Sequence, residues 1–127
     1  MRLKIILACT FLGGCSVAPV YEAPAVAAPD QPTAIKGAKK AANQAKLVGT
    51  VEISAVRKAY PLGPGPYVLC IKGTNSLPGA RTYAVFFKNN DYVSVRSSVI
   101  IDDCEGQAFG SLGSGPFPED AEGPQPK

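Results

Sequence analysis

Arg81–Ser98, RTYAVFFKNNDYVSVRSS, is the stretch that decides the fold. Two runs rich in β-branched and aromatic residues flank Asn89-Asn90. Asparagine tolerates the positive φ that both positions of a two-residue hairpin turn require. The stretch therefore predicts a β-hairpin with Lys88 opposite Asp91.

The alternation of side chains gives the two faces of this hairpin different characters. In the predicted register Phe86 lies opposite Val93 and Ala84 opposite Val95, so one face is aliphatic. The other face carries the candidate partner-binding residues, which are Tyr83, Phe87, Tyr92 and Arg96. Aromatic residues and arginine dominate binding hot spots. Alternatively, the first strand, the proline-rich loop or the N-terminal segment covers this face, and Tyr83 makes a cation–π contact with Arg96.

The period of two continues on both sides of the hairpin and is typical of β-strands. Clusters of Gly and Pro at 61–66 and 75–79 separate the runs and predict turns. Strands are expected near Val48–Lys58, Pro66–Gly73, Ala80–Lys88 and Asp91–Ile101, with a short fifth near Gln107–Leu112. The fold class is therefore all-β, a small antiparallel sheet of four to five strands in meander order.

The N-terminus has the layout of a secretory signal, because Arg2 and Lys4 precede the apolar run Ile5–Leu12. A membrane-spanning helix needs about 20 apolar residues, so this run is too short to be one. Leu12-Gly13-Gly14-Cys15 resembles the lipobox of bacterial lipoproteins. The resemblance implies that residues 1–14 are a signal peptide and that Cys15 carries a diacylglycerol thioether and an acylated amine. The alternative is a buried apolar N-terminal strand.

Ser16, rather than Asp, follows the lipobox cysteine. In enteric-type lipoproteins this implies sorting to the outer membrane, so we expect the chain at the periplasmic face of that membrane. The anchor makes the membrane itself the first expected partner.

The segments that flank the predicted sheet look unfolded. Residues 15–45 are rich in Ala and Pro with few large apolar side chains, which predicts a disordered tether. Only Lys36–Lys46 has a composition that suits a helix, and its lysines either rest on anionic lipid or are solvated. Residues 113–127 predict a disordered tail. The folded unit expected from the sequence is 46–112.

So small a unit buries a limited share of its surface on folding, and it needs a crosslink such as a disulfide for stability. Cys70 and Cys104 remain as a pair once Cys15 is lipidated, and an exported chain meets an oxidising compartment. A Cys70–Cys104 disulfide is therefore predicted, with a contribution of about 3–4 kcal/mol in the loop-entropy model. A zinc site at these cysteines is not expected, because there is no CxxC motif and no histidine.

The composition argues against catalysis and against nucleic acid. There is no histidine to act as a base and no Gly-rich phosphate loop, so we expect neither an enzyme nor a cofactor. Asp102, Asp103 and Glu105 could ligate a hard cation, but they lack the EF-hand spacing and suit a solvated turn. Loss of Arg2 and Lys4 with the signal lowers the net charge from +3 to +1, too little to attract nucleic acid.

We therefore expect a non-catalytic binding or structural module that contacts an envelope protein. The alternative is a periplasmic inhibitor or a small-ligand-binding lipoprotein that acts through a loop such as Gly73–Gly79.

Replacement of the lipobox cysteine tests the anchor directly. Cys15→Ser should abolish incorporation of labelled palmitate and release the protein from membranes, because stable anchoring needs more than one acyl chain. Labelling that persists in this variant would contradict the lipobox interpretation.

Overall fold

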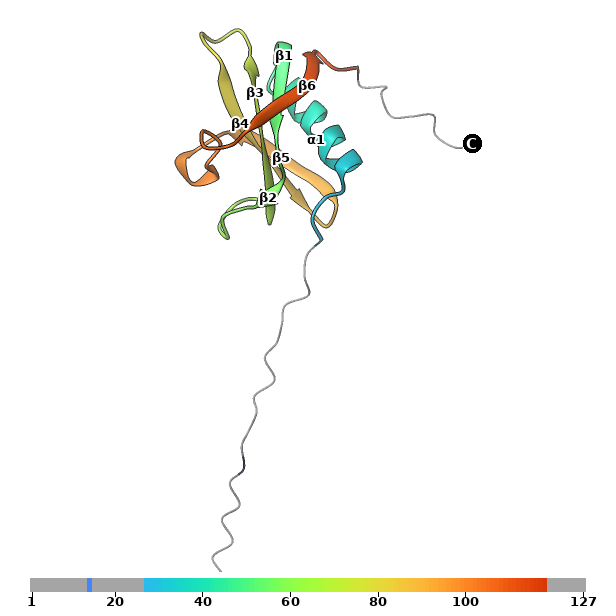
Figure 1. Ribbon diagram of the computed structural model, residues 1–127, viewed down its shortest axis with the longest axis vertical. Coiled ribbons are helices and arrows are strands. Elements are labelled where there is room, and N and C mark those ends of the chain that lie inside the picture. The colour runs from blue at the N-terminus through green and yellow to red at the C-terminus, as the bar shows by residue number, and fades with distance from the viewer. Residues whose placement is uncertain (1–13, 15–26, 119–127) are drawn as a thin grey trace, which may run out of the picture.

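The computed structural model describes Gly14 and residues 27–118. One antiparallel sheet and one α-helix dominate this part of the chain (Figure 1). The elements in chain order are α1 (Gln31–Gln44), β1 (Val48–Ser54), β2 (Arg57–Lys58), β3 (Tyr67–Thr74), β4 (Arg81–Lys88), β5 (Asp91–Ser97), a 3₁₀ turn (Ile100–Asp102) and β6 (Phe109–Gly115). The predicted antiparallel β-sheet is confirmed, with the helix as an addition.

The strands lie in the order β5-β4-β3-β1-β6, and the short β2 also pairs with β3. β3, β4 and β5 form the expected meander of consecutive hairpins. The predicted fifth strand corresponds to β6, which pairs with β1 at the opposite edge from β5. The connection between β5 and β6 must therefore cross one face of the sheet.

Residues 31–44 form a helix, which corrects the expectation of a disordered tether over 15–45 and overlaps Lys36–Lys46, the stretch whose composition suits a helix. Asp30 is the N-cap, and its carboxylate accepts a hydrogen bond from the Thr33 backbone N–H at 2.8 Å. A stripe of small residues faces the sheet, and its members are Ala34, Gly37, Ala38, Ala41 and Ala42. These residues bury little side-chain area themselves, but they let the helix backbone approach the large side chains of the sheet.

The C-terminal limit of the folded unit also moves outward. β6 runs to Gly115, and Phe117 is buried although it was expected in the tail 113–127. The side chain of Asn43 donates to the Phe117 carbonyl at 2.7 Å and accepts from its N–H at 2.9 Å. The last turn of α1 thus holds the end of β6, and the boundaries 46–112 are too narrow. The signal 1–14, apart from Gly14, and the outer parts of the predicted tether and tail lie outside the described residues.

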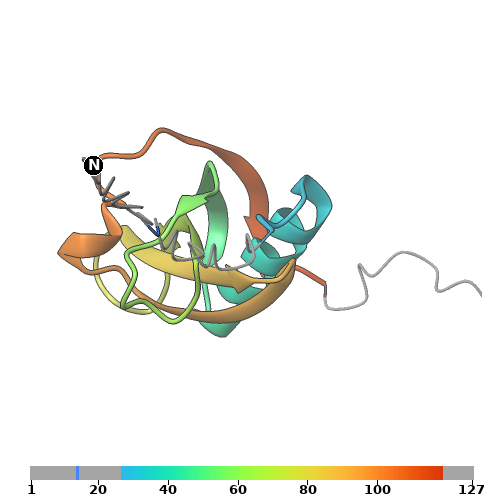
Figure 2. The same ribbon diagram turned by 90° about the horizontal axis from the view of Figure 1, so that it is seen from below.

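Hydrophobic side chains gather on both faces of the sheet. Between the sheet and α1 the buried residues include Leu69, Val85 and Phe87. On the opposite face a smaller cluster contains Val68, Cys70, Ala84, Phe86 and Cys104. The view from below shows how the strands curl, with α1 at one side of the sheet (Figure 2).

The predicted disulfide is confirmed. Cys70 on β3 is bonded to Cys104 in the β5–β6 connection, with Cα atoms 5.6 Å apart. Both cysteines are buried. The bond fixes the connection to the middle of the sheet on the face away from α1.

Gly37 should not tolerate a side chain, although it lies inside a helix. A Cβ at this position would lie 2.5 Å from Cε1 of the buried Phe87 ring. We expect Gly37→Ala to lower the free energy of unfolding by about 1–3 kcal/mol, as overpacking usually does. Chemical denaturation measures this change in the free energy of unfolding.

Gly110→Ala is the matched control, because a Cβ at Gly110 on β6 meets no atom within 4 Å. Its unfolding free energy should stay the same or rise by up to about 1 kcal/mol. A stabilised Gly37→Ala variant would contradict the close approach of α1.

Candidate functional site

The predicted aromatic surface is covered by α1. Phe87 is completely buried and Tyr83 nearly so. The Tyr83 hydroxyl accepts a hydrogen bond from the Asn75 side chain at 2.7 Å. Of the two interpretations given above, the structure therefore supports a covered face, and the covering element comes from the N-terminal segment.

Tyr92 lies at the border of this covered face and is half-buried. The Tyr92 ring meets the Phe87 ring edge-on, with the two centroids 6.3 Å apart. The Lys40 ammonium lies 4.8 Å from the centroid of the Tyr92 ring. The Tyr92 hydroxyl donates to the side-chain oxygen of Gln44. Burial raises the pKa of this hydroxyl, which is a further sign that the residue belongs to the helix–sheet contact.

Arg96 lies on the opposite face, so the predicted pairing of Tyr83 with Arg96 is wrong. A bulge interrupts the β4–β5 register between Phe86 and Phe87, and beyond it Arg96 pairs with Ala84. One extra residue in a strand turns every later side chain to the other face. The Arg96 guanidinium therefore lies over the Phe86 ring, 5.0 Å from its centroid.

The same arginine anchors the β5–β6 connection. It donates to the carboxylate of the buried Asp102 at 2.9 Å, and the other oxygen of that carboxylate accepts from the Val99 N–H at 2.9 Å. Asp102 is thus engaged inside the turn. The structure brings together no cluster of three metal-ligating side chains among the residues it describes.

An exposed apolar loop that was not expected from the sequence follows β5. Val99, Ile100 and Ile101 follow β5, and Ile100 is 97% exposed. The disulfide holds this loop through Cys104 and the ion pair holds it through Asp102. The sequence carried a signal, since three consecutive β-branched residues break the alternation of the preceding strand. They were included in the predicted strand Asp91–Ile101 instead.

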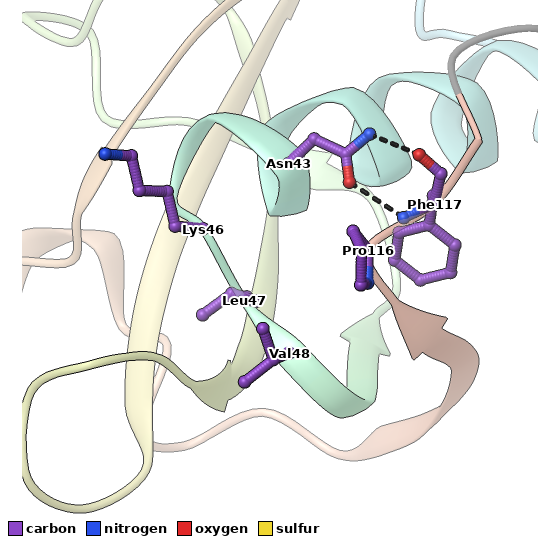
Figure 3. A pocket seen from close by; sticks show the side chains of 6 residues that line it. All are labelled: Asn43, Lys46, Leu47, Val48, Pro116 and Phe117. Carbon is purple, nitrogen blue, oxygen red and sulfur yellow. Dashed lines mark hydrogen bonds between the residues drawn. The ribbon is translucent and has the colours of Figure 1, made fainter.

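Two shallow hollows lie elsewhere on the described surface. One, of about 370 Å³, lies beside the C-terminal end of α1 and is lined by Asn43, Lys46, Leu47, Val48, Pro116 and Phe117 (Figure 3). Both polar groups of the Asn43 amide already bond the Phe117 backbone, so this amide is engaged within the fold. The other hollow, of about 530 Å³, lies along the proline-rich loop between Lys58 and Lys88.

The loop Gly73–Gly79, the candidate for an inhibitory loop, is tied to the domain. The Asn75 amide donates to the Ala45 carbonyl at 3.2 Å as well as to Tyr83, and its oxygen accepts from the Leu77 N–H. Leu77 is half exposed. This loop offers less apolar surface than the one at Ile100.

Cys15 lies outside the described residues, so its lipidation stays a prediction. No helix within residues 27–118 has the length and apolarity needed to span a membrane. The chain matches no protein-family model, no curated protein and no solved structure.

Truncation of Phe87 tests whether the aromatic face is core. Because the ring is fully buried under α1, Phe87→Ala should lower the unfolding free energy by about 3–5 kcal/mol. Tyr60→Ala is the control, since Tyr60 is about half exposed and its loss should change stability by no more than about 0.5 kcal/mol. Equal, small effects in thermal unfolding would mean that the face is exposed.

Proposed function

We propose that this chain is a lipid-anchored extracytoplasmic protein that acts as a non-catalytic binding module. Its binding element is the loop 98–106, which it presents to an envelope protein. The lipobox Leu12–Cys15 and the basic, apolar segment before it support the anchor. The observation that carries the binding role is the near-complete exposure of Ile100 on a loop held by the Cys70–Cys104 disulfide and the Arg96–Asp102 ion pair.

The loop has the properties of a preorganised contact. Its conformation is fixed by the disulfide and by the Arg96–Asp102 pair before any partner arrives. Binding therefore costs little ordering of the loop, and more of the apolar contact energy remains as affinity. Three neighbouring aliphatic side chains give the contact a hydrophobic centre.

The surroundings of the loop indicate the character of the partner. Asp103 and Glu105 are exposed beside the aliphatic residues. A complementary surface would be an apolar pocket with a basic rim. Because the proposed anchor and export place the chain in the cell envelope, the expected partner is an envelope protein.

A photo-crosslinking amino acid in place of Ile100 tests this function in intact cells. We expect one prominent protein adduct from position 100. The matched control is position 93 on β5, because Val93 is an exposed β-branched residue outside the loop. The same pattern of adducts at both positions, or none at position 100, would contradict the proposal.

A charged residue introduced into the loop provides a second test of the proposed binding role. Ile100→Asp should leave the unfolding free energy within about 0.5 kcal/mol, since the side chain is exposed. Capture of the partner found by crosslinking should fall at least tenfold. Unchanged capture by a stably folded Ile100→Asp protein would show that the loop is not the contact.

A further inference from the structure

We propose that residues 59–66, the loop between β2 and β3, form a membrane-contact surface. We call this segment the proline loop. It lies against the headgroups of an anionic bilayer and orients the domain beside its anchor. This inference rests on the proposed lipid anchor at Cys15.

The proline loop has a defined shape. The Ala59 N–H donates to the Pro66 carbonyl at 2.9 Å, and the Gly63 N–H donates to the Tyr60 carbonyl at 2.9 Å. Gly65 lies so close to β4 that a Cβ there would be 2.8 Å from the Phe87 carbonyl oxygen. The loop is thus fixed to the end of the β4–β5 hairpin.

The chemistry of the proline loop suits a membrane interface. Leu62 is 85% exposed and Tyr60 is 51% exposed. Lys58 and Lys88 are exposed on either side of the loop and line the hollow along it. Tyrosine is enriched at membrane–water interfaces, and long basic side chains reach from an apolar contact to the headgroups.

Two carboxylates also lie near this end of the domain. Asp30 accepts hydrogen bonds from the Thr33 N–H and from the Asn90 amide, so its charge is partly satisfied within the fold. Asp91 is exposed opposite Lys88 in the hairpin. The lysines beside the loop therefore face the bilayer with at most one exposed acidic neighbour on the hairpin.

The described chain enters the domain at the same end. The Asp30 N–H donates to the side chain of Asn90 at 2.9 Å, so the N-terminal segment joins the domain at the β4–β5 turn. Figure 1 shows the start of α1, this turn and the loop after β2 at one end of the domain. Fourteen residues separate Cys15 from Asp30, and that length of chain can span at most about 50 Å. An anchor at Cys15 would thus hold Asp30 within about 50 Å of the bilayer.

Leu62→Cys, labelled with a polarity-sensitive fluorophore, tests the contact in the full chain as purified from membranes. In the mature lipidated chain the new thiol is free, because Cys70 and Cys104 form the disulfide and Cys15 is a thioether. With phosphatidylglycerol-containing vesicles we expect a blue shift of the emission. The matched control is Leu77→Cys, a half-exposed leucine in the loop after β3, at the other end of the β3–β4 hairpin, where no shift is expected.

The lysines provide the electrostatic arm. Lys58→Gln and Lys88→Gln should each lower the membrane-embedded fraction of the label about fivefold, and added salt should do the same. Equal shifts at positions 62 and 77 would overturn the proposal. So would an equal shift with phosphatidylcholine vesicles, or a shift that needs an envelope protein as well as lipid.

Palmitate labelling of the same preparation separates this inference from the proposed anchor. A palmitate-labelled protein without a shift at position 62 overturns the membrane contact and leaves the anchor standing. Absence of palmitate overturns the anchor. Because Cys15 is then a second free thiol, the contact is read from Leu62→Cys in a Cys15→Ser background, where a shift supports it and no shift overturns it.

Discussion

The close approach of α1 to β4 is the constraint on which the rest of the structure depends. The Phe87 ring fills the space that a side chain at Gly37 would need. Alanines above and below Gly37 keep the helix backbone near the sheet along its length. Once the helix lies there, the Asp30 side chain reaches the β4–β5 turn and Asn43 reaches the end of β6. A helix with ordinary large residues on this face could make neither contact.

Both faces of the sheet are therefore occupied, each by a different means. α1 covers one face by hydrophobic packing, and the β5–β6 connection covers the other through a disulfide and an ion pair. The described domain therefore has no exposed flat sheet face that a partner could cover. The loops therefore present the most exposed large apolar side chains of the described domain, Ile100 and Leu62.

The sequence was informative where local chemistry decides structure. Asn89-Asn90 does form the turn, with positive φ at both residues, and Lys88 lies opposite Asp91 as predicted. The disulfide followed from simple pairing of the remaining cysteines. The bulge after Tyr92 could not be foreseen, because nothing in the alternation Val93–Val95 marks the extra residue. The predicted register without the bulge therefore assigned Arg96 to the face opposite the one it occupies. The sequence suggested a helix only over Lys36–Lys46, and its packing on the sheet was missed for another reason. Alanine and glycine bury little area alone, and their value depends on a partner such as Phe87 that is distant in sequence.

The attachment of Asp30 to Asn90 also decides how the domain responds to mechanical force. Tension applied from the N-terminal side enters at the first turn of α1, where a few hydrogen bonds to the β4–β5 turn meet it before the sheet does. Behind this attachment the strands are joined by their hydrogen-bond ladders and by the disulfide, so α1 is the element nearest to the point where the pull enters. This helix covers Phe87 and Tyr83. A pull from the N-terminal side therefore acts first on the element that covers the aromatic residues of the sheet.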